Sequence, residues 1–215
     1  DIEAAVKHCA AGKFRNAGQV CISPTRFFIE EPVYDEFIKS FKSHVEAINV
    51  GDGLDSKSTM GPLVADRRLE VMEDFISDAI SSGGEVISGG GRGQSPGSFF
   101  EPTLIRDVPD TAKIMIEEPF GPVAPSASFS SIDEIIERAN SLPFGLASYA
   151  FTSNPRTSQI LKSEIESGML AINSMHIHSV ETPFGGLKHS GYGYEGSIEG
   201  LEAFLVTKYS SEIYT

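Results

Sequence analysis

The chain has 215 residues, 40% of them hydrophobic, which is enough apolar material to bury a substantial core. Its formal net charge of −13 repels phosphate backbones and anionic lipids, so we expect no nucleic-acid partner, and no apolar run approaches the roughly 20 residues that cross a bilayer. Two cysteines form no disulfide framework and indicate a reducing compartment, for which we take the cytoplasm.

The first helix is predicted at the start of the chain. Ile2, Val6 and Cys9 are spaced by four and three residues, which places Cys9 on the buried face of an amphipathic helix as a core residue. The chain opens with Asp1 rather than Met and has no basic and apolar leader, so we expect it to be part of a longer protein.

Cys21 has different surroundings from Cys9. It follows a loop of small and polar residues at 14–20 and precedes a strand predicted at 26–30, and loops at the ends of elements commonly carry reactive side chains. A free thiol with a pKa of about 8.5 is only a few per cent thiolate at neutral pH, so a nucleophilic Cys21 needs backbone N–H donors or the charge of Arg15 nearby. Composition alone favours the alternative, an inert buried cysteine.

The middle of the chain predicts two helices, a loop and a strand followed by a helix. The first helix has an apolar stripe of Tyr34, Phe37, Ile38, Phe41, Val45 and Ile48. The second lies at 66–83 and has the stripe Leu69, Met72, Ile76 and Ile80. The glycine-rich stretch 83–97 predicts a long loop, and residues 123–129 predict a strand. Ser131 and Glu134 form a capping box for the next helix.

The last third predicts a strand–helix–strand unit. Residues 146–152 alternate as a strand, Asn154-Pro155 begins a helix that stops at Gly168, and residues 169–173 form the second strand. Such a unit requires parallel pairing, so we predict an α/β fold with an open, mostly parallel sheet covered by helices on both faces. Residues 204–215 are interpreted as a strand or tail that leaves the domain.

Two patterns are rejected as cofactor or metal sites. Residues 191–196 match G-x-G-x-x-G, but only 19 residues follow Gly196, too few for the roughly 30-residue βαβ unit that gives this pattern its meaning. His176, His178 and Glu181 suggest a metal site, but no further ligand accompanies them, so we expect no metal.

Three motifs resemble those of the aldehyde dehydrogenase superfamily, in the same order along the chain. They are Phe14-Arg15-Asn16-Ala17-Gly18-Gln19-Val20-Cys21, then Glu117-Glu118-Pro119-Phe120-Gly121-Pro122-Val123, and then Pro183-Phe184-Gly185-Gly186-Leu187-Lys188-His189-Ser190-Gly191. The resemblance implies that residues 1–203 are a catalytic domain, that the dinucleotide-binding domain of the family is absent from the chain, and that 204–215 serve assembly into a homodimer or homotetramer.

The resemblance also implies roles for individual residues. Cys21 would attack the aldehyde carbon, its own backbone N–H would help to hold the oxyanion, and hydride would pass to NAD or NADP. Glu118 would accept a hydrogen bond from the nicotinamide ribose, and Phe120 would pack beside the ring. For Glu118 the alternative is a solvated surface carboxylate. The asparagine of the oxyanion site and the glutamate that activates water would lie upstream of residue 1.

Residues 179–186 and Arg15 are most similar to the succinic semialdehyde dehydrogenase group within this superfamily. There, the arginine grips the substrate carboxylate, for which bidentate geometry suits Arg better than Lys. The resemblance therefore assigns Arg15, His178, Ser179 and Phe184 to substrate binding, although His178 stands where that group has a serine. The alternatives are that Arg15 pairs with a local acid and that the substrate is an aromatic or other aldehyde.

Two other functions were weighed against aldehyde oxidation. The chain by itself could be catalytically silent and act only as a folding and oligomerisation module, because the base and most cofactor contacts are expected outside it. A cysteine hydrolase would need a histidine held against Cys21, and no spacing places one there.

Overall fold

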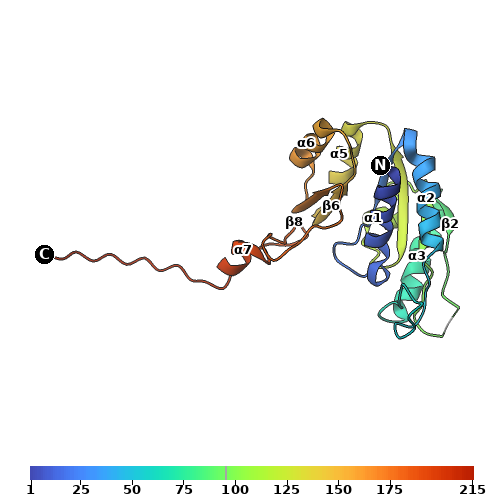
Figure 1. Cartoon of the computed structure of the whole chain (residues 1–215), viewed down its shortest axis with the longest axis horizontal. Helices are drawn as coiled ribbons and strands as arrows, with labels where there is room; N and C mark the ends of the chain where they lie inside the picture. The colour runs from blue at the N-terminus through green and yellow to red at the C-terminus, as the bar shows by residue number, and fades with distance from the viewer. Residues whose placement is uncertain (95) are drawn as a thin grey trace.

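A four-stranded sheet lies at the centre of the protein, for which a computed structural model describes residues 1–94 and 96–215 (Figure 1). Its strands are β1 (Phe27–Glu30), β2 (Glu85–Ser88), β3 (Thr103–Arg106) and β4 (Val123–Phe129), in the order β1-β4-β3-β2. β1 and β3 each pair with β4 in parallel, whereas β2 pairs with β3 in antiparallel orientation. The predicted α/β class and the mostly parallel sheet are confirmed.

The prediction of a long loop at 83–97 is wrong, because β2 lies inside it. Val86 pairs with Ile105 across the antiparallel ladder, so this short segment satisfies its backbone groups at the edge of the sheet. Gly83 and Gly89 flank β2 with positive φ angles of 112° and 70°. Because the strand has only four residues and glycines flank it, the composition of this segment predicts a loop.

Helices α1 (Ile2–Phe14) and α2 (Tyr34–Glu46) pack against each other, and a short 3-10 turn, η2 (Glu31–Val33), joins β1 to α2. α1 begins where the Asp1 carboxylate accepts a hydrogen bond from the Ala4 N–H at 2.9 Å, which satisfies one of the free donors of the first turn. Cys9 is buried on this helix, as predicted. α2 ends at Glu46, so Ile48 contacts the core from the loop that follows rather than from the helix.

Helix α3 (Arg67–Ser81) agrees with the prediction except at its last turn, and it packs against the one-turn helix α4 (Lys113–Ile116). Ile80 was assigned to the buried stripe, but its side chain is 52% exposed. The buried face instead passes through Phe75 and Ala79, so Ile80 lies at the border of the stripe. A spacing rule cannot locate that border because it depends on the width of the packed surface.

The predicted strand–helix–strand unit is confirmed in β6 (Ala147–Ala150), α6 (Pro155–Glu164) and β7 (Met169–Ile172), with β6 and β7 parallel. The Asn154 side chain caps α6 by accepting from the N–H of Arg156 at 2.9 Å. β6 and β7 form a two-stranded sheet of their own, separate from the four-stranded sheet.

Helix α5 (Ile132–Asn140) begins at the predicted capping residues with a different bond pattern. Ser131 Oγ accepts from the Glu134 N–H at 3.3 Å, but the Glu134 carboxylate reaches the N–H of Ser130 rather than that of Ser131. After α5, the strand β5 (Phe144–Gly145) pairs antiparallel with β8 (Leu187–Lys188).

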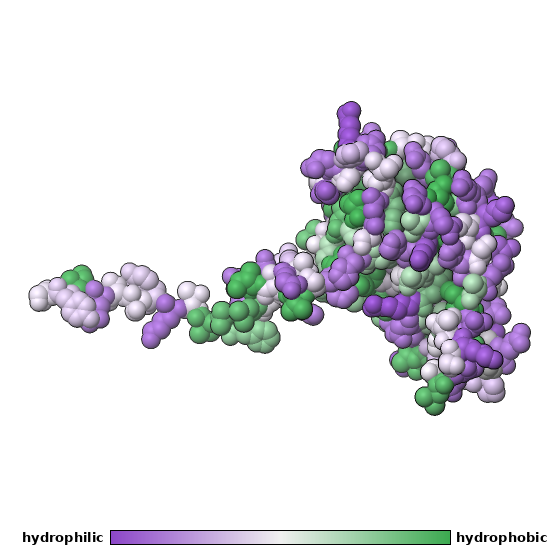
Figure 2. Space-filling view, viewed as in Figure 1, coloured by the Kyte–Doolittle hydropathy of each residue, from purple (hydrophilic) through white to green (hydrophobic). Residues whose placement is uncertain are grey.

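The C-terminal segment projects from the body after the short helix α7 (Ser197–Glu202), as Figure 1 shows at its left-hand side. Residues 205–215 have no regular secondary structure and form an extended tail in the chain taken alone. The interpretation of 204–215 as a segment used in assembly stays a prediction. In Figure 2 apolar atoms of this tail stand clear of the body. Its exposed large apolar side chains are Phe204, Leu205, Val206, Tyr209, Ile213 and Tyr214. Among the described residues, no helix combines the length and apolar character needed to cross a membrane.

Phe41 is the centre of the contacts between the first helices and β1. Its side chain is fully buried, and its ring lies 5.2 Å from that of Phe27, 5.6 Å from that of Phe37 and 6.3 Å from that of Phe14. Because Phe14 is the last residue of α1, this cluster determines where the chain leaves the helix and enters the loop that carries Cys21.

We predict that Phe41→Ala lowers the free energy of unfolding by about 3–5 kcal/mol, because it leaves a cavity among three aromatic rings. Ile80→Ala is the matched control on a half-exposed helical position and should cost less than about 1 kcal/mol. Denaturant unfolding of the complete protein that contains this chain measures both changes. Equal losses for the two variants would contradict the central packing role of Phe41.

Candidate active site

The loop that leads to Cys21 contains three successive residues with left-handed backbone. Asn16, Ala17 and Gly18 have φ angles of 52°, 54° and 72° within the turn η1 (Arg15–Gly18). A left-handed conformation costs roughly 1–2 kcal/mol for a residue with a Cβ, so surrounding contacts must hold Ala17 in place. The reversal brings Cys21 to the surface, where its side chain is exposed.

Gln19 supplies many of the contacts that hold this loop. Its side-chain amide donates to the carbonyl oxygens of Asn16 at 3.0 Å and Pro62 at 3.3 Å, and its side-chain oxygen accepts from the Val64 N–H at 2.8 Å. The Asn16 side chain in turn donates to the Gln19 carbonyl at 3.0 Å. These bonds connect residues within the loop and connect the loop to the segment before α3. The position of Cys21 therefore depends on that segment as well as on the turn itself.

The two cysteines differ as predicted. Cys9 is buried, and burial raises the pKa of its thiol to about 12, so it stays protonated at neutral pH. Cys21 is exposed at the end of the strained loop, and its backbone N–H donates to no group within residues 1–94 and 96–215. The interpretation of Cys21 as an inert buried residue is therefore wrong, and the amide of Cys21 is free to bind an oxyanion.

The loop at 117–122 lies directly against the cysteine loop. A Cβ built on Gly18 would lie 2.1 Å from the carbonyl oxygen of Gly121, so the two backbones touch at a distance that only glycine permits. Phe120 has a φ angle of 43° and is 39% exposed, and Glu118 is exposed beside it. The guanidinium group of Arg68 donates to the Pro119 carbonyl, which anchors this loop to α3.

Lys13 is a charged residue of this region that the sequence reading missed. Its side chain is fully buried, and its Nζ atom has no hydrogen-bond partner among the described residues. Burial lowers the pKa of its ammonium group to about 7, and the charge of Glu118 opposes the shift. Lys13 is four residues from Cys9 and seven from Val6, so the helical stripe predicted in α1 already pointed to its burial.

Tyr149 on β6 contacts the chain directly after Cys21. Its hydroxyl donates to the carbonyl of Ile22 at 2.8 Å, which links β6 to the residue after the cysteine. Burial raises the pKa of Tyr149 to about 12; the charge of Cys21 adds to this increase and that of Arg15 opposes it. Tyr149 thus contacts the backbone at the residue after Cys21, and the charges of Cys21 and Arg15 act on its hydroxyl. No sequence pattern indicates this contact, because it joins residues 127 positions apart.

The predicted substrate residues His178 and Ser179 line a cavity of about 400 Å³ next to β7. Phe184 lies edge-on to the His178 ring, with the ring centroids 6.3 Å apart. Cys21 and Arg15 are not among the residues that line this cavity. The structure thus brings His178, Ser179 and Phe184 together, whereas Arg15 and Cys21 lie outside the cavity that His178 and Ser179 line.

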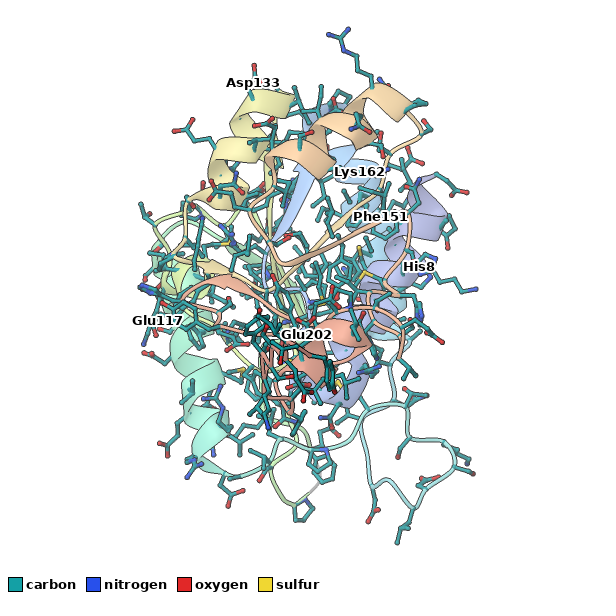
Figure 3. The ribbon with its side chains drawn as sticks, turned by 90° about the vertical axis from the view of Figure 1, so that its left-hand side faces the viewer. His8, Glu117, Asp133, Phe151, Lys162 and Glu202 are labelled. Carbon is teal, nitrogen blue, oxygen red and sulfur yellow. The ribbon has the colours of Figure 1, made fainter. Side chains whose placement is uncertain are left out.

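Two contacts hold the segment after β7 and the end of β6 against α1. The side chain of Met175 packs on Gly12, where an added Cβ would lie 2.3 Å from the Met175 terminal carbon. His8 stacks on Phe151 with the ring centroids 5.9 Å apart, and Figure 3 shows these two side chains next to each other. The segment that leads to His178 and Ser179 is therefore anchored to the helix that precedes the cysteine loop.

The two rejected patterns have structural explanations. Glu195, inside residues 191–196, pairs with Phe184 in both directions at 2.8 Å, so this glycine-rich segment folds back on the neighbouring motif instead of opening a βαβ unit. His176 and His178 stack with centroids 5.9 Å apart. Within the described part of the chain, no group of three or more His, Cys, Asp and Glu side chains could hold a metal ion.

Comparison with known proteins gives the family. The sequence profile described as "Aldehyde dehydrogenase family" matches residues 1–210. The chain belongs to the aldehyde dehydrogenase family. Over 97% of its length it is 39% identical to the NADP-dependent succinate-semialdehyde dehydrogenase of Escherichia coli and 42% identical to the 4-(hydroxymethyl)benzenesulfonate dehydrogenase of Comamonas testosteroni. Each alignment covers 43% of the relative.

A solved structure agrees with this family. Succinate-semialdehyde dehydrogenase from Burkholderia pseudomallei superposes with a TM-score of 0.94 at 38% identity, over 96% of this chain and 43% of that one. The chain therefore spans less than half the length of the relatives it matches. The three motifs that carried the resemblance lie within the matched residues, and the family assignment made from them is confirmed.

We predict that Lys13→Met raises the melting temperature by several degrees at about pH 6. Because the pKa of Lys13 falls from 10.5 to about 7 on folding, the unfolded chain binds more protons between these values, and the free energy of unfolding increases with pH there. The cost of the buried charge is complete below pH 7, and methionine removes it. The advantage of the variant should shrink as the pH rises towards 10.

Thermal unfolding across this pH range measures the difference. Lys7→Met, at an exposed position of the same helix, is the matched control and should change the melting temperature little at any pH. A Lys13→Met protein that is less stable than the wild type at about pH 6 would contradict the unpaired burial of Lys13.

Proposed function

We propose that this protein oxidises an aldehyde that carries an anionic group to the corresponding acid, with Cys21 as the nucleophile and NAD or NADP as the cofactor. The observation that supports this most is the exposed Cys21 at the end of a left-handed loop that touches the 117–122 loop through Gly18 and Gly121. This contact supports the proposal, because it brings the loop that carries Cys21 next to the residues proposed to meet the cofactor.

The chemistry begins at Cys21. Its thiolate adds to the carbonyl carbon, the new C–S bond forms as the carbonyl π bond becomes an oxyanion, and the free Cys21 N–H donates to that oxyanion. A hydride then leaves the former aldehyde carbon, the C–O double bond re-forms and a thioester remains on Cys21. Water cleaves the thioester to the acid and regenerates the thiol. No residue of this chain is assigned as the base that activates the water.

Glu118 and Phe120 fit the nicotinamide end of the cofactor. The Glu118 carboxylate is exposed and able to accept a hydrogen bond from a ribose hydroxyl. Phe120 nearby has a left-handed backbone, and its ring is partly exposed. NAD or NADP, when bound, supplies the hydride acceptor. Glu118 and Phe120 are proposed to contact only the nicotinamide end of the dinucleotide, so they do not select between NAD and NADP.

The proposed substrate class rests on Arg15 and on the names of the relatives. One relative is named for succinate semialdehyde, which has a carboxylate, and another for a benzenesulfonate. Arg15 is exposed near Cys21 and Tyr149, and a guanidinium group binds either anion through parallel N–H donors. His178 and Ser179 line the adjoining cavity and are proposed to contact the rest of the substrate, with Phe184 behind His178.

A second function is proposed for the tail. The exposed apolar side chains of residues 204–215 have no partner within the described chain, and burying such side chains between subunits stabilises oligomers. This supports assembly as a homodimer or homotetramer in the cytoplasm, with residues 1–203 as the catalytic domain. If the chain is inactive by itself, this assembly role would be its remaining function.

We predict that Cys21→Ser lowers the rate of aldehyde oxidation by several orders of magnitude while dinucleotide binding is retained, because only the nucleophile is lost. Cys9→Ala is the matched control and should keep most of the turnover. Iodoacetamide should label Cys21 and spare buried Cys9, which tests exposure independently of activity. Normal turnover of Cys21→Ser in the complete protein would refute the assignment.

We predict that Arg15→Ala raises KM for carboxylated and sulfonated aldehydes at least tenfold more than for a neutral aldehyde of similar size, roughly the value of one charge-assisted bond. Steady-state kinetics of the complete protein on matched pairs of aldehydes give this ratio. Arg156→Ala, on the exposed face of α6, is the control. An equal effect of Arg15→Ala on charged and neutral aldehydes would show that Arg15 does not recognise the anionic group.

A further inference from the structure

Lys13 is a buried cation that the proposed chemistry does not use. It lies in the last turn of α1, its side chain is fully buried, and its Nζ atom has no acceptor among the described residues. Buried ammonium groups are almost always paired, because an unpaired one loses its hydration without compensation. The C-terminal end of a helix favours a positive charge, but it does not supply a specific partner for Nζ.

Two charged groups on other elements belong to the same region. Glu118 is the acid whose charge acts on Lys13, and the charge of Lys13 acts on Glu118 in return. Arg68 from α3 also acts on Glu118 and donates to the carbonyl of Pro119, the next residue. The side chains of Lys13 and Glu118 form no salt bridge among those of the described residues, so the interaction between them is one of charges that are not in direct contact.

The backbones around the two groups are held rigidly. The Ser23 hydroxyl donates to the Lys13 carbonyl at 3.2 Å, and a Cβ on Gly18 would come within 3.3 Å of that oxygen as well as within 2.1 Å of Gly121. The end of α1, the cysteine loop and the 117–122 loop therefore form one packed unit. Neither Lys13 nor the loop that carries Glu118 can move away from the other without disrupting the Gly18–Gly121 contact.

We propose that Lys13 is a positioning residue of the cofactor site, whose buried ammonium group keeps the Glu118 carboxylate ionised and directed to accept a hydroxyl of the nicotinamide ribose. The inference rests on the proposed role of Glu118. Partial desolvation raises the pKa of Glu118, and the nearby Lys13 charge opposes this increase. A protonated Glu118 would present a donor in place of one of its acceptor oxygens, so it would bind the ribose less well.

The test compares the affinity of the complete protein for NADH or NADPH, measured by cofactor fluorescence, for wild type and Lys13→Met between about pH 5.5 and 9. At about pH 6 Lys13 is charged, and the variant should bind at least about threefold more weakly, because Glu118 loses the nearby positive charge that opposes its protonation. At about pH 9 Lys13 is neutral in the folded protein, so the two affinities should converge. Lys7→Met should match the wild type throughout.

Glu118→Gln completes the experiment, because it removes the titrating partner. In the Glu118→Gln background, Lys13→Met should have the same effect at every pH, which a double-mutant cycle measures. If Glu118→Gln leaves cofactor affinity unchanged, the proposed role of Glu118 is wrong. If Glu118→Gln weakens binding but the ratio between Lys13→Met and wild type does not vary with pH, only the positioning role of Lys13 is overturned.

Discussion

The contact between Gly18 and Gly121 is the constraint on which the candidate site depends. The carbonyl oxygen of Gly121 occupies the position that a side chain on Gly18 would need, and a Cβ on Gly121 would lie 2.2 Å from the sulfur of Met72. Three elements that are far apart in the sequence thus meet at two glycines: the cysteine loop, the 117–122 loop and α3. A proposed nucleophile and a proposed cofactor contact share one rigid junction because neither glycine carries a side chain.

Several positively charged side chains lie around this junction, whereas the protein as a whole is negatively charged. The chain has a net charge of −13, yet Lys13, Arg15 and Arg68 surround the cysteine loop and Glu118. Lys13 is buried and without a hydrogen-bond partner among the described residues, which is a costly arrangement for a purely structural residue. Positive charge near the cysteine loop favours the binding of an anionic substrate, which is the substrate class proposed for this site.

Several sequence predictions succeeded because they depended on local physics. The caps at Ser131 and Asn154 and the parallel pairing of β6 with β7 follow from side-chain chemistry and from the short connection between strands. The failures depended on non-local packing. β2 forms because β3 is there to pair with it, and Ile80 is exposed because the core ends beside it.

The sequence by itself determined the α/β class, the distinction between Cys9 and Cys21, and the three motifs that assign the chain to its family, since periodicity, capping and motif order are all local properties. Only the tertiary structure decided which residues surround Cys21. The Tyr149 hydroxyl bonds to the carbonyl of Ile22, and the Gln19 amide bonds to the N–H of Val64. The charge of Lys13 interacts with that of Glu118 on another loop. Contacts of this kind arise when distant segments pack, and no spacing along the chain encodes them.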